Sequence, residues 1–111
     1  MRIADRIKIY LGAQAVMARK HYNIRVRGKV QGVFYRASAR SHALALEVNG
    51  FAQNQRDGSV YIEAEGAEEN LKQFVEWCRR GPDRALVTEV LVEEGPLNHF
   101  TSFEVNRGTY H

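Results

Sequence analysis

The sequence predicts an α+β fold in which two helices cover one face of an antiparallel sheet, in the order β-α-β-β-α-β. Three observations predict it. Apolar and polar residues alternate over residues 22–27, an Asp57-Gly58 pair separates two further strand-like runs, and residues 67–80 carry apolar side chains at helical spacing. With 111 residues, the chain has the length of one domain with a single hydrophobic core.

The first strand is predicted over residues 22–27, because Tyr22, Ile24 and Val26 alternate with polar residues. The first helix is predicted over residues 36–47. Its apolar residues recur at helical spacing, and Gly50 follows the pattern as a stop signal.

Two strands follow, at residues 50–55 and 59–65, and the Asp-Gly pair between them predicts a hairpin. The second helix is predicted over residues 67–80 and is ended by Gly81-Pro82. Its apolar stripe comprises Leu71, Phe74, Val75 and Cys78, and we expect these residues and Trp77 to serve packing.

The run at residues 85–93 breaks its alternation around Thr88 and Glu89, which predicts a β-bulge. A last short strand is expected at residues 103–105. Together these elements form a split βαβ or ferredoxin-like sandwich. That architecture carries RNA-binding modules, metal carriers and small enzymes, so function has to be argued from a site.

Composition excludes several function classes. Cys78 is the only cysteine, so no intrachain disulfide can form and a reducing, cytoplasmic compartment is expected. The four histidines, His21, His42, His99 and His111, lack the short spacings of metal ligands, so no metal and no other cofactor is expected. The net charge of +3 fits phosphate-bearing ligands of any size, nucleic acid included.

Residues 1–20 are predicted to be an N-terminal extension of a domain that comprises residues 21–111. The extension is a flexible or helical appendage, or an upstream start of the reading frame ahead of Met17. Its apolar stretch at residues 9–18 is too short to span a bilayer and lacks the sustained apolar core of a secretory signal.

The loop before the first helix has the features of an anion site. Residues 28–35 contain Gly28 and Gly32 but no Ser, Thr, Asp or Asn, so the helix lacks a usual N-cap and leaves backbone N–H groups unpaired. Gly32 allows these N–H groups to curl around an oxyanion, and Arg36 adds a two-pronged donor for phosphate oxygens. On local features alone, an ordinary strand-to-helix turn is the favoured interpretation, because glycine-bearing turns and surface arginines are both common.

Two sequence blocks decide between these readings. Residues 28–36, Gly-Lys-Val-Gln-Gly-Val-Phe-Tyr-Arg, resemble the acylphosphatase signature Gly-x-Val-Gln-Gly-Val-x-aromatic-Arg. Residues 50–54, Gly-Phe-Ala-Gln-Asn, followed by Asp57-Gly58, are similar to the family's block Gly-Trp-Val-x-Asn with its Asp-Gly pair. The resemblance covers roughly residues 22–106 and also matches the element order.

The resemblance implies an enzyme that hydrolyses the carboxyl-phosphate bond of acyl phosphates by water attack, without metal or covalent intermediate. It places the family's phosphate-binding arginine on Arg36 and its water-orienting asparagine on Asn54. The implied partners are a small acyl phosphate and inorganic phosphate, and a monomer without membrane attachment is expected. The amides of the implied phosphate-binding loop are those of Gln31, Gly32, Val33, Phe34, Tyr35 and Arg36.

One departure from the family pattern is Ala39, at a position where members often carry Ser or Thr to orient the asparagine. Ser38 points a quarter-turn or more away and does not substitute for it. This leaves open a catalytically weakened acylphosphatase-like binding module. Asp57, Glu63 and Glu65 are expected to be a turn residue and solvent-facing strand residues, rather than a catalytic pair.

A nucleic-acid-binding module on the same fold is the remaining alternative. Tyr22, Phe51 and Tyr61 lie on predicted strands, where such modules stack bases. The Lys/Arg-Gly-aromatic block of these modules is absent, and the three aromatic residues are at least as well explained as core. This alternative is therefore less favoured.

Overall fold

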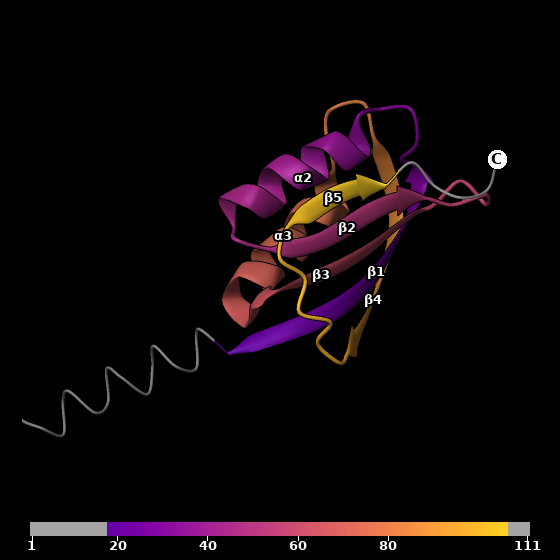
Figure 1. Cartoon of the computed structure of the whole chain (residues 1–111). Helices are drawn as coiled ribbons and strands as arrows, with labels where there is room; N and C mark the ends of the chain where they lie inside the picture. The colour runs from indigo at the N-terminus through magenta and orange to yellow at the C-terminus, as the bar shows by residue number, and fades with distance from the viewer. Residues whose placement is uncertain (1–17, 107–111) are drawn as a thin grey trace, which may run out of the picture.

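Five strands form one sheet in the order β4-β1-β3-β2-β5 (Figure 1). The computed structural model describes residues 18–106, so the predicted extension lies almost wholly outside the described residues. Neighbouring strands are antiparallel except for β2 and β5, which are parallel. Along the chain the elements are β1 (Arg19–Lys29), α2 (Tyr35–Ala45), β2 (Asn49–Asn54), β3 (Val60–Ala67), α3 (Glu68–Arg80), β4 (Leu86–Gly95) and β5 (Phe103–Asn106).

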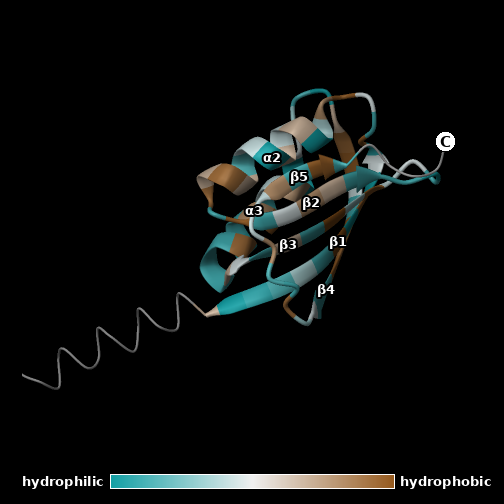
Figure 2. Cartoon of the chain, in the orientation of Figure 1, coloured by the Kyte–Doolittle hydropathy of each residue, from teal (hydrophilic) through white to brown (hydrophobic). Residues whose placement is uncertain are grey.

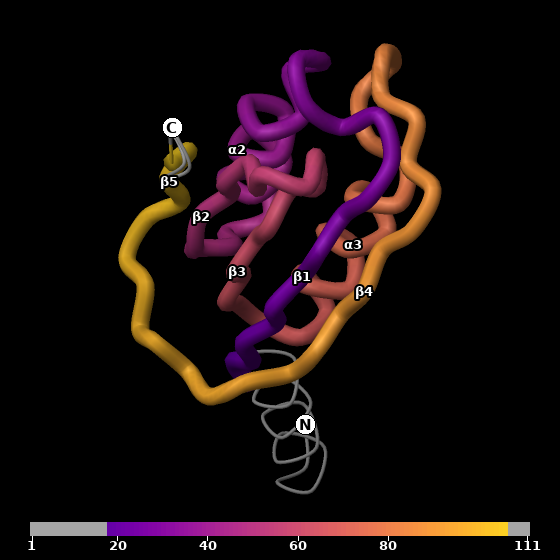
Figure 3. Tube along the Cα trace, turned by 90° about the vertical axis from the view of Figure 1, so that its right-hand side faces the viewer, coloured from indigo at the N-terminus to yellow at the C-terminus, as the bar shows by residue number. Residues whose placement is uncertain are grey.

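The predicted fold class is confirmed, and the last short strand expected at residues 103–105 is present as β5. The first six elements follow the order β-α-β-β-α-β. Figure 3 shows both helices on one side of the sheet and the chain after β4 running around the end of the sheet to the opposite edge, where β5 lies beside β2. Neither helix in residues 18–106 is long and apolar enough to cross a membrane.

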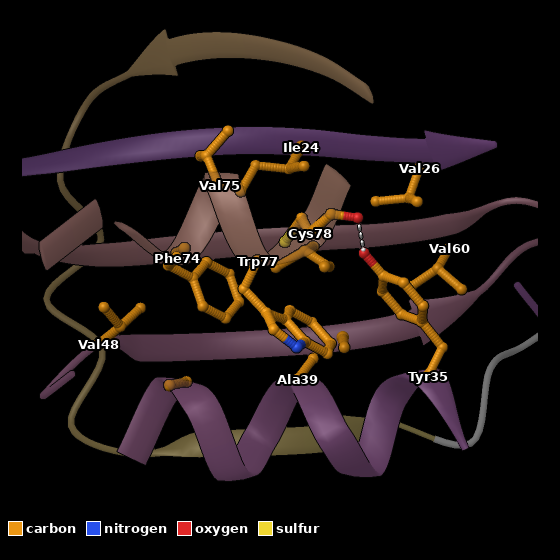
Figure 4. Close-up of a cluster of buried hydrophobic side chains, with 14 of the residues drawn as sticks. Ile24, Val26, Tyr35, Ala39, Val48, Val60, Phe74, Val75, Trp77 and Cys78 are labelled. Atoms are coloured by element: carbon orange, nitrogen blue, oxygen red, sulfur yellow. Dashed lines mark hydrogen bonds between the residues drawn. The ribbon is translucent and has the colours of Figure 1, made fainter. Parts of the chain in front are cut away.

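The core lies between the sheet and the helices (Figure 4). Because strand side chains alternate between faces, Ile24 and Val26 of β1 are buried against the helices. Trp77 and Phe74 of α3 fill the centre, as predicted, and the Tyr35 hydroxyl at the start of α2 donates a hydrogen bond to the Cys78 carbonyl at 2.7 Å. This bond joins the two helices. In Figure 2, hydrophilic and hydrophobic residues alternate along α2, as in a helix with one buried side.

The bulge predicted around Thr88 is confirmed. Arg27 pairs with Glu89 whereas Gly28 pairs with Val87, so Thr88 has no partner on β1. Gly28 has a φ of 123°, and a Cβ there would lie 2.1 Å from the Leu86 carbonyl oxygen. Only glycine allows the two strands to approach this closely.

The end of the first helix differs from the prediction. The helix α2 ends at Ala45. The cap is formed by backbone hydrogen bonds that the amide of Leu46 donates to carbonyls of the last helical turn. Glu47 has a positive φ of 56° and turns the chain toward β2. Gly50 is therefore not the stop signal. It is required because a Cβ at this position would lie 1.8 Å from the Glu63 carbonyl oxygen on β3.

The prediction that Glu65 faces solvent is wrong. Its side chain is fully buried on the sheet face opposite the helices, under residues 96–102. One carboxylate oxygen accepts a hydrogen bond from His21 Nδ1 at 2.8 Å and another from the Asn98 amide, and the second oxygen accepts one from the Phe100 amide at 2.9 Å. The alternation along β3 correctly placed Glu65 on the face opposite the helices, but it did not indicate that residues 96–102 cover this face.

Candidate active site

The loop between β1 and α2 has an unusual backbone. Gly32 has a φ of 74°, and Phe34 at the N-cap of α2 has φ 63° and ψ 25°, the left-handed region. Phe34 makes no side-chain cap bond, as predicted. Within residues 18–106, the first amide of this region to donate to a backbone carbonyl is that of Ser38, which bonds the Phe34 carbonyl at 3.0 Å. The amides of residues 31–37 thus remain available to a ligand or to solvent.

The side chain of Gln31 fixes this loop to the β2–β3 hairpin. Its amide nitrogen donates to the carbonyls of Gln55 and Ser59, at 2.7 Å and 2.9 Å. In the same turn, hydrogen bonds from the Ser59 hydroxyl and amide lower the pKa of Asp57, which is a turn residue as expected. Sequence reasoning included Gln31 for its backbone amide only and missed this structural bond.

Two arginines of α2 hold the edge strand β5. Arg36 Nη1 donates to the Asn106 carbonyl, and one turn later Arg40 Nε donates to the Phe103 carbonyl at 3.1 Å. A guanidinium has five N–H groups, so Arg36 retains donors for a ligand while this bond fixes the direction of its side chain. The arginine is therefore anchored before any substrate binds.

Asn54 ends β2, next to this loop. Its Oδ1 atom is buried and has no hydrogen-bond partner within residues 18–106. A buried acceptor without a partner costs about 1–3 kcal/mol, so such atoms are rare unless water or a ligand satisfies them. Asn54 Oδ1 is thus a candidate binding atom.

Arg36 and Asn54 line one pocket of about 270 Å³ together with Gly32, Phe34 and Tyr35. The remaining lining residues are Val30, Ala37 and Val105. The side chains of Gln31 and Val33 do not line it, because the first bonds the hairpin and the second is buried in the core. Val105 comes from β5, whose position beside β2 sequence reasoning did not foresee.

The two other titratable groups near the start of α2 are not suited to act as acid, base or nucleophile. Burial raises the pKa of the Tyr35 hydroxyl, which already donates to the Cys78 carbonyl. Burial also raises the pKa of the Cys78 thiol to about 12, so this thiol stays protonated at neutral pH. Within residues 18–106, no three His, Cys, Asp or Glu side chains are grouped as metal ligands; the expectation that no metal is used stays a prediction.

Ala39 is fully buried one turn into α2. Its methyl group offers no hydrogen-bond donor, in keeping with the unpartnered Oδ1 of Asn54. The departure from the family pattern at Ala39 thus coincides with an unpartnered acceptor on Asn54, the residue that a Ser or Thr at this position would orient.

The three aromatic residues that were predicted on strands lie on both faces of the sheet. Tyr22 packs against the core, as expected, whereas Phe51 and Tyr61 lie half-buried and outside the core cluster, with ring centroids 6.0 Å apart. Phe100 packs edge-on against Phe51. The interpretation of these two residues as core is therefore wrong, since residues of β2 and β3 at these positions face away from the helices.

Comparison with known proteins shows the family to which the chain belongs. The family model described as Acylphosphatase matches residues 22–105. An acylphosphatase of Marinobacter nauticus is 46% identical over 88 residues, which cover 78% of this chain and 96% of the relative. Two solved acylphosphatase structures superpose with a TM-score of 0.77. The structure from Coxiella burnetii is 34% identical, and the match covers 79% of this chain and 93% of that one. The structure from Bacillus subtilis is 35% identical, and the match covers 78% of this chain and 98% of that one. The chain belongs to the acylphosphatase family.

Proposed function

We propose that the pocket at the N-terminus of α2 is where this acylphosphatase hydrolyses acyl phosphates. Arg36 and the backbone amides of residues 31–36 bind the phosphate group, and Asn54 holds the attacking water. The observation that carries this assignment is that Asn54, whose buried Oδ1 has no hydrogen-bond partner within residues 18–106, lines the same pocket as Arg36 and the start of α2.

The donors in this pocket suit the charge distribution of phosphoryl transfer. Negative charge is spread over three phosphate oxygens in the transition state, and preorganised N–H groups stabilise it. The helix N-terminus adds a partial positive charge, and Arg36 adds a full one. Because Gln31 and the Arg36–Asn106 bond hold the loop and the guanidinium in place, little reorganisation is needed during the reaction.

The reaction needs no strong base. The bond between phosphorus and the carboxylate oxygen breaks as water attacks phosphorus, and the leaving group is a stable carboxylate. Asn54 Oδ1 accepts a hydrogen bond from the water and orients it, while the substrate's own phosphate oxygen takes the released proton. The high pKa of Cys78 and the engaged hydroxyl of Tyr35 agree with direct attack by water, without a covalent intermediate.

The proposal is tested by phosphate release from benzoyl phosphate with a chelator present. We expect the same turnover in a parallel assay with added metal in place of the chelator. We also expect inorganic phosphate to inhibit competitively. Phosphate binding at the loop without turnover would instead support the weakened binding module that Ala39 suggests. We also propose that residues 21–111 act as a cytoplasmic monomer, which sedimentation and fractionation can check.

Replacing Ala39 by threonine is expected to raise kcat several-fold, with little change in phosphate affinity. The added hydroxyl can donate to Asn54 Oδ1 and fix the amide that orients the water. Steady-state kinetics with phosphate as inhibitor measure both quantities. Ala43→Thr is the matched control, because Ala43 is also fully buried on α2 but lies one turn further from the N-terminal end of the helix, where the pocket is. A gain in Ala43→Thr as well would assign the effect to general packing rather than to Asn54.

A further inference from the structure

We propose that Phe34, together with Val105, forms the binding surface for the acyl group and makes the enzyme favour aromatic and large apolar acyl phosphates over small ones. This inference rests on the proposed function. It concerns the part of the substrate that the phosphate-binding donors do not contact.

Phe34 combines two features that do not stabilise the fold. Its side chain is 73% exposed, the largest exposure among the big apolar residues of the described chain. Its φ of 63° lies in the left-handed region, which bulky residues rarely adopt and which strains the backbone. Phe34 also takes no part in any aromatic ring pair within residues 18–106. An exposed, strained aromatic residue at a binding pocket, outside every ring pair of residues 18–106, points to a ligand contact.

The position of Phe34 matches the position that the acyl group must take. Phe34 occupies the N-cap position of α2 and lines the same pocket as Arg36 and Asn54. With phosphate held on the loop amides and Arg36, the carboxyl end of the substrate extends toward the open side of the pocket. Phe34 and Val105, the second of which is 37% exposed, are the lining residues that combine a large apolar side chain with solvent exposure.

The charge of the pocket also favours an apolar acyl group. Arg36 is the one charged side chain among its described lining residues, and it is committed to phosphate and to the Asn106 carbonyl. Among the described lining residues, no further cationic group is left for an acyl chain with its own carboxylate. An aromatic ring, in contrast, can stack on Phe34 and contact Val105.

The test compares kcat/KM for benzoyl phosphate with that for acetyl phosphate, in the wild type and in Phe34→Gly. We expect the benzoyl-to-acetyl ratio to fall by about five-fold, the scale of one aromatic pair. The ratio carries the test because the amide of residue 34 stays in the loop, and any change in the loop acts on both substrates. Glycine accepts the positive φ, so we expect the midpoint of thermal unfolding to stay or to rise by a few degrees, about 4 °C.

Three further variants sharpen the result. Phe34→Asn, which tolerates the left-handed backbone, should lower the ratio like glycine, and Val105→Ala should lower it less. Leu86→Ala, at a 66% exposed leucine away from the pocket, should leave it unchanged. An unchanged ratio in Phe34→Gly overturns the inference, as does a large fall in its unfolding midpoint, which would make Phe34 a packing residue. Absence of hydrolysis of both substrates by the wild type overturns the proposed function instead.

Discussion

Asn54→Ala is expected to lower kcat for acyl phosphate hydrolysis by about 100-fold, while inorganic phosphate still binds within a few-fold of wild type. In the proposed mechanism the amide contacts the water and not the phosphate, so its loss leaves the phosphate-binding donors intact. Folding should not suffer, because Asn54 Oδ1 has no hydrogen-bond partner within residues 18–106 that its removal would leave unpaired. Steady-state kinetics and phosphate inhibition measure the two effects separately.

Arg36→Ala is expected to lower kcat and phosphate affinity together. In the proposed mechanism the guanidinium bonds the phosphate both in the bound substrate and in the transition state, so its removal weakens ground-state binding and also lowers the rate. The matched control is Arg40→Ala, which removes the other bond from α2 to β5 without touching the pocket. Arg40→Ala should keep kcat within a few-fold. Equal losses in Arg36→Ala and Arg40→Ala would mean that Arg36 acts by holding β5. For the preceding prediction, near-normal turnover in Asn54→Ala would remove Asn54 from the mechanism.

The elements that the sequence predicts well are those decided by local pattern. The alternation at residues 22–27, the broken alternation at Thr88 and the Gly81-Pro82 stop each depend on neighbouring residues, and each agrees with the structure. The missing N-cap at Phe34 was predicted in the same way. Local sterics and hydrogen bonding are sufficient to specify these features.

The features that it misses depend on contacts between distant residues. Glu65 is buried because residues 96–102, which follow it by some thirty positions, cross over it. The alternation of side chains within β3 carries no information about that segment. Val105 reaches the pocket because β5 pairs in parallel with β2, about fifty residues away. Asn54 was identified only through its resemblance to a known block, because a lone asparagine at a hairpin end is usually a turn residue.

The buried pair of Glu65 and His21 is expected to stabilise the fold from the sheet face opposite the helices. It fixes the segment that leads to β5, which carries Val105 of the pocket and the Asn106 carbonyl bound by Arg36. Burial alone would raise the pKa of Glu65, but the bonds from the Asn98 amide, the His21 ring and the Phe100 amide outweigh burial and lower it. The carboxylate is thus the form that the folded state binds.

Glu65→Ala is therefore expected to lower the free energy of unfolding by about 3–5 kcal/mol near neutral pH, since it leaves two backbone amides and a histidine without their acceptor. Chemical denaturation measures the loss. The control Glu76→Ala removes a 72% exposed glutamate that pairs with Arg79, and it should cost less than about 0.5 kcal/mol. The pH dependence gives a second readout. Because the folded pKa of Glu65 lies below its unfolded value of about 4.5, the stabilisation is complete above pH 4.5 and is lost as the pH falls through the folded pKa. The difference between wild type and Glu65→Gln should accordingly shrink as the pH falls below 4.5. A difference that stays constant down to pH 3 would show that packing of the side chain, and not its charge, holds residues 96–102 on the sheet.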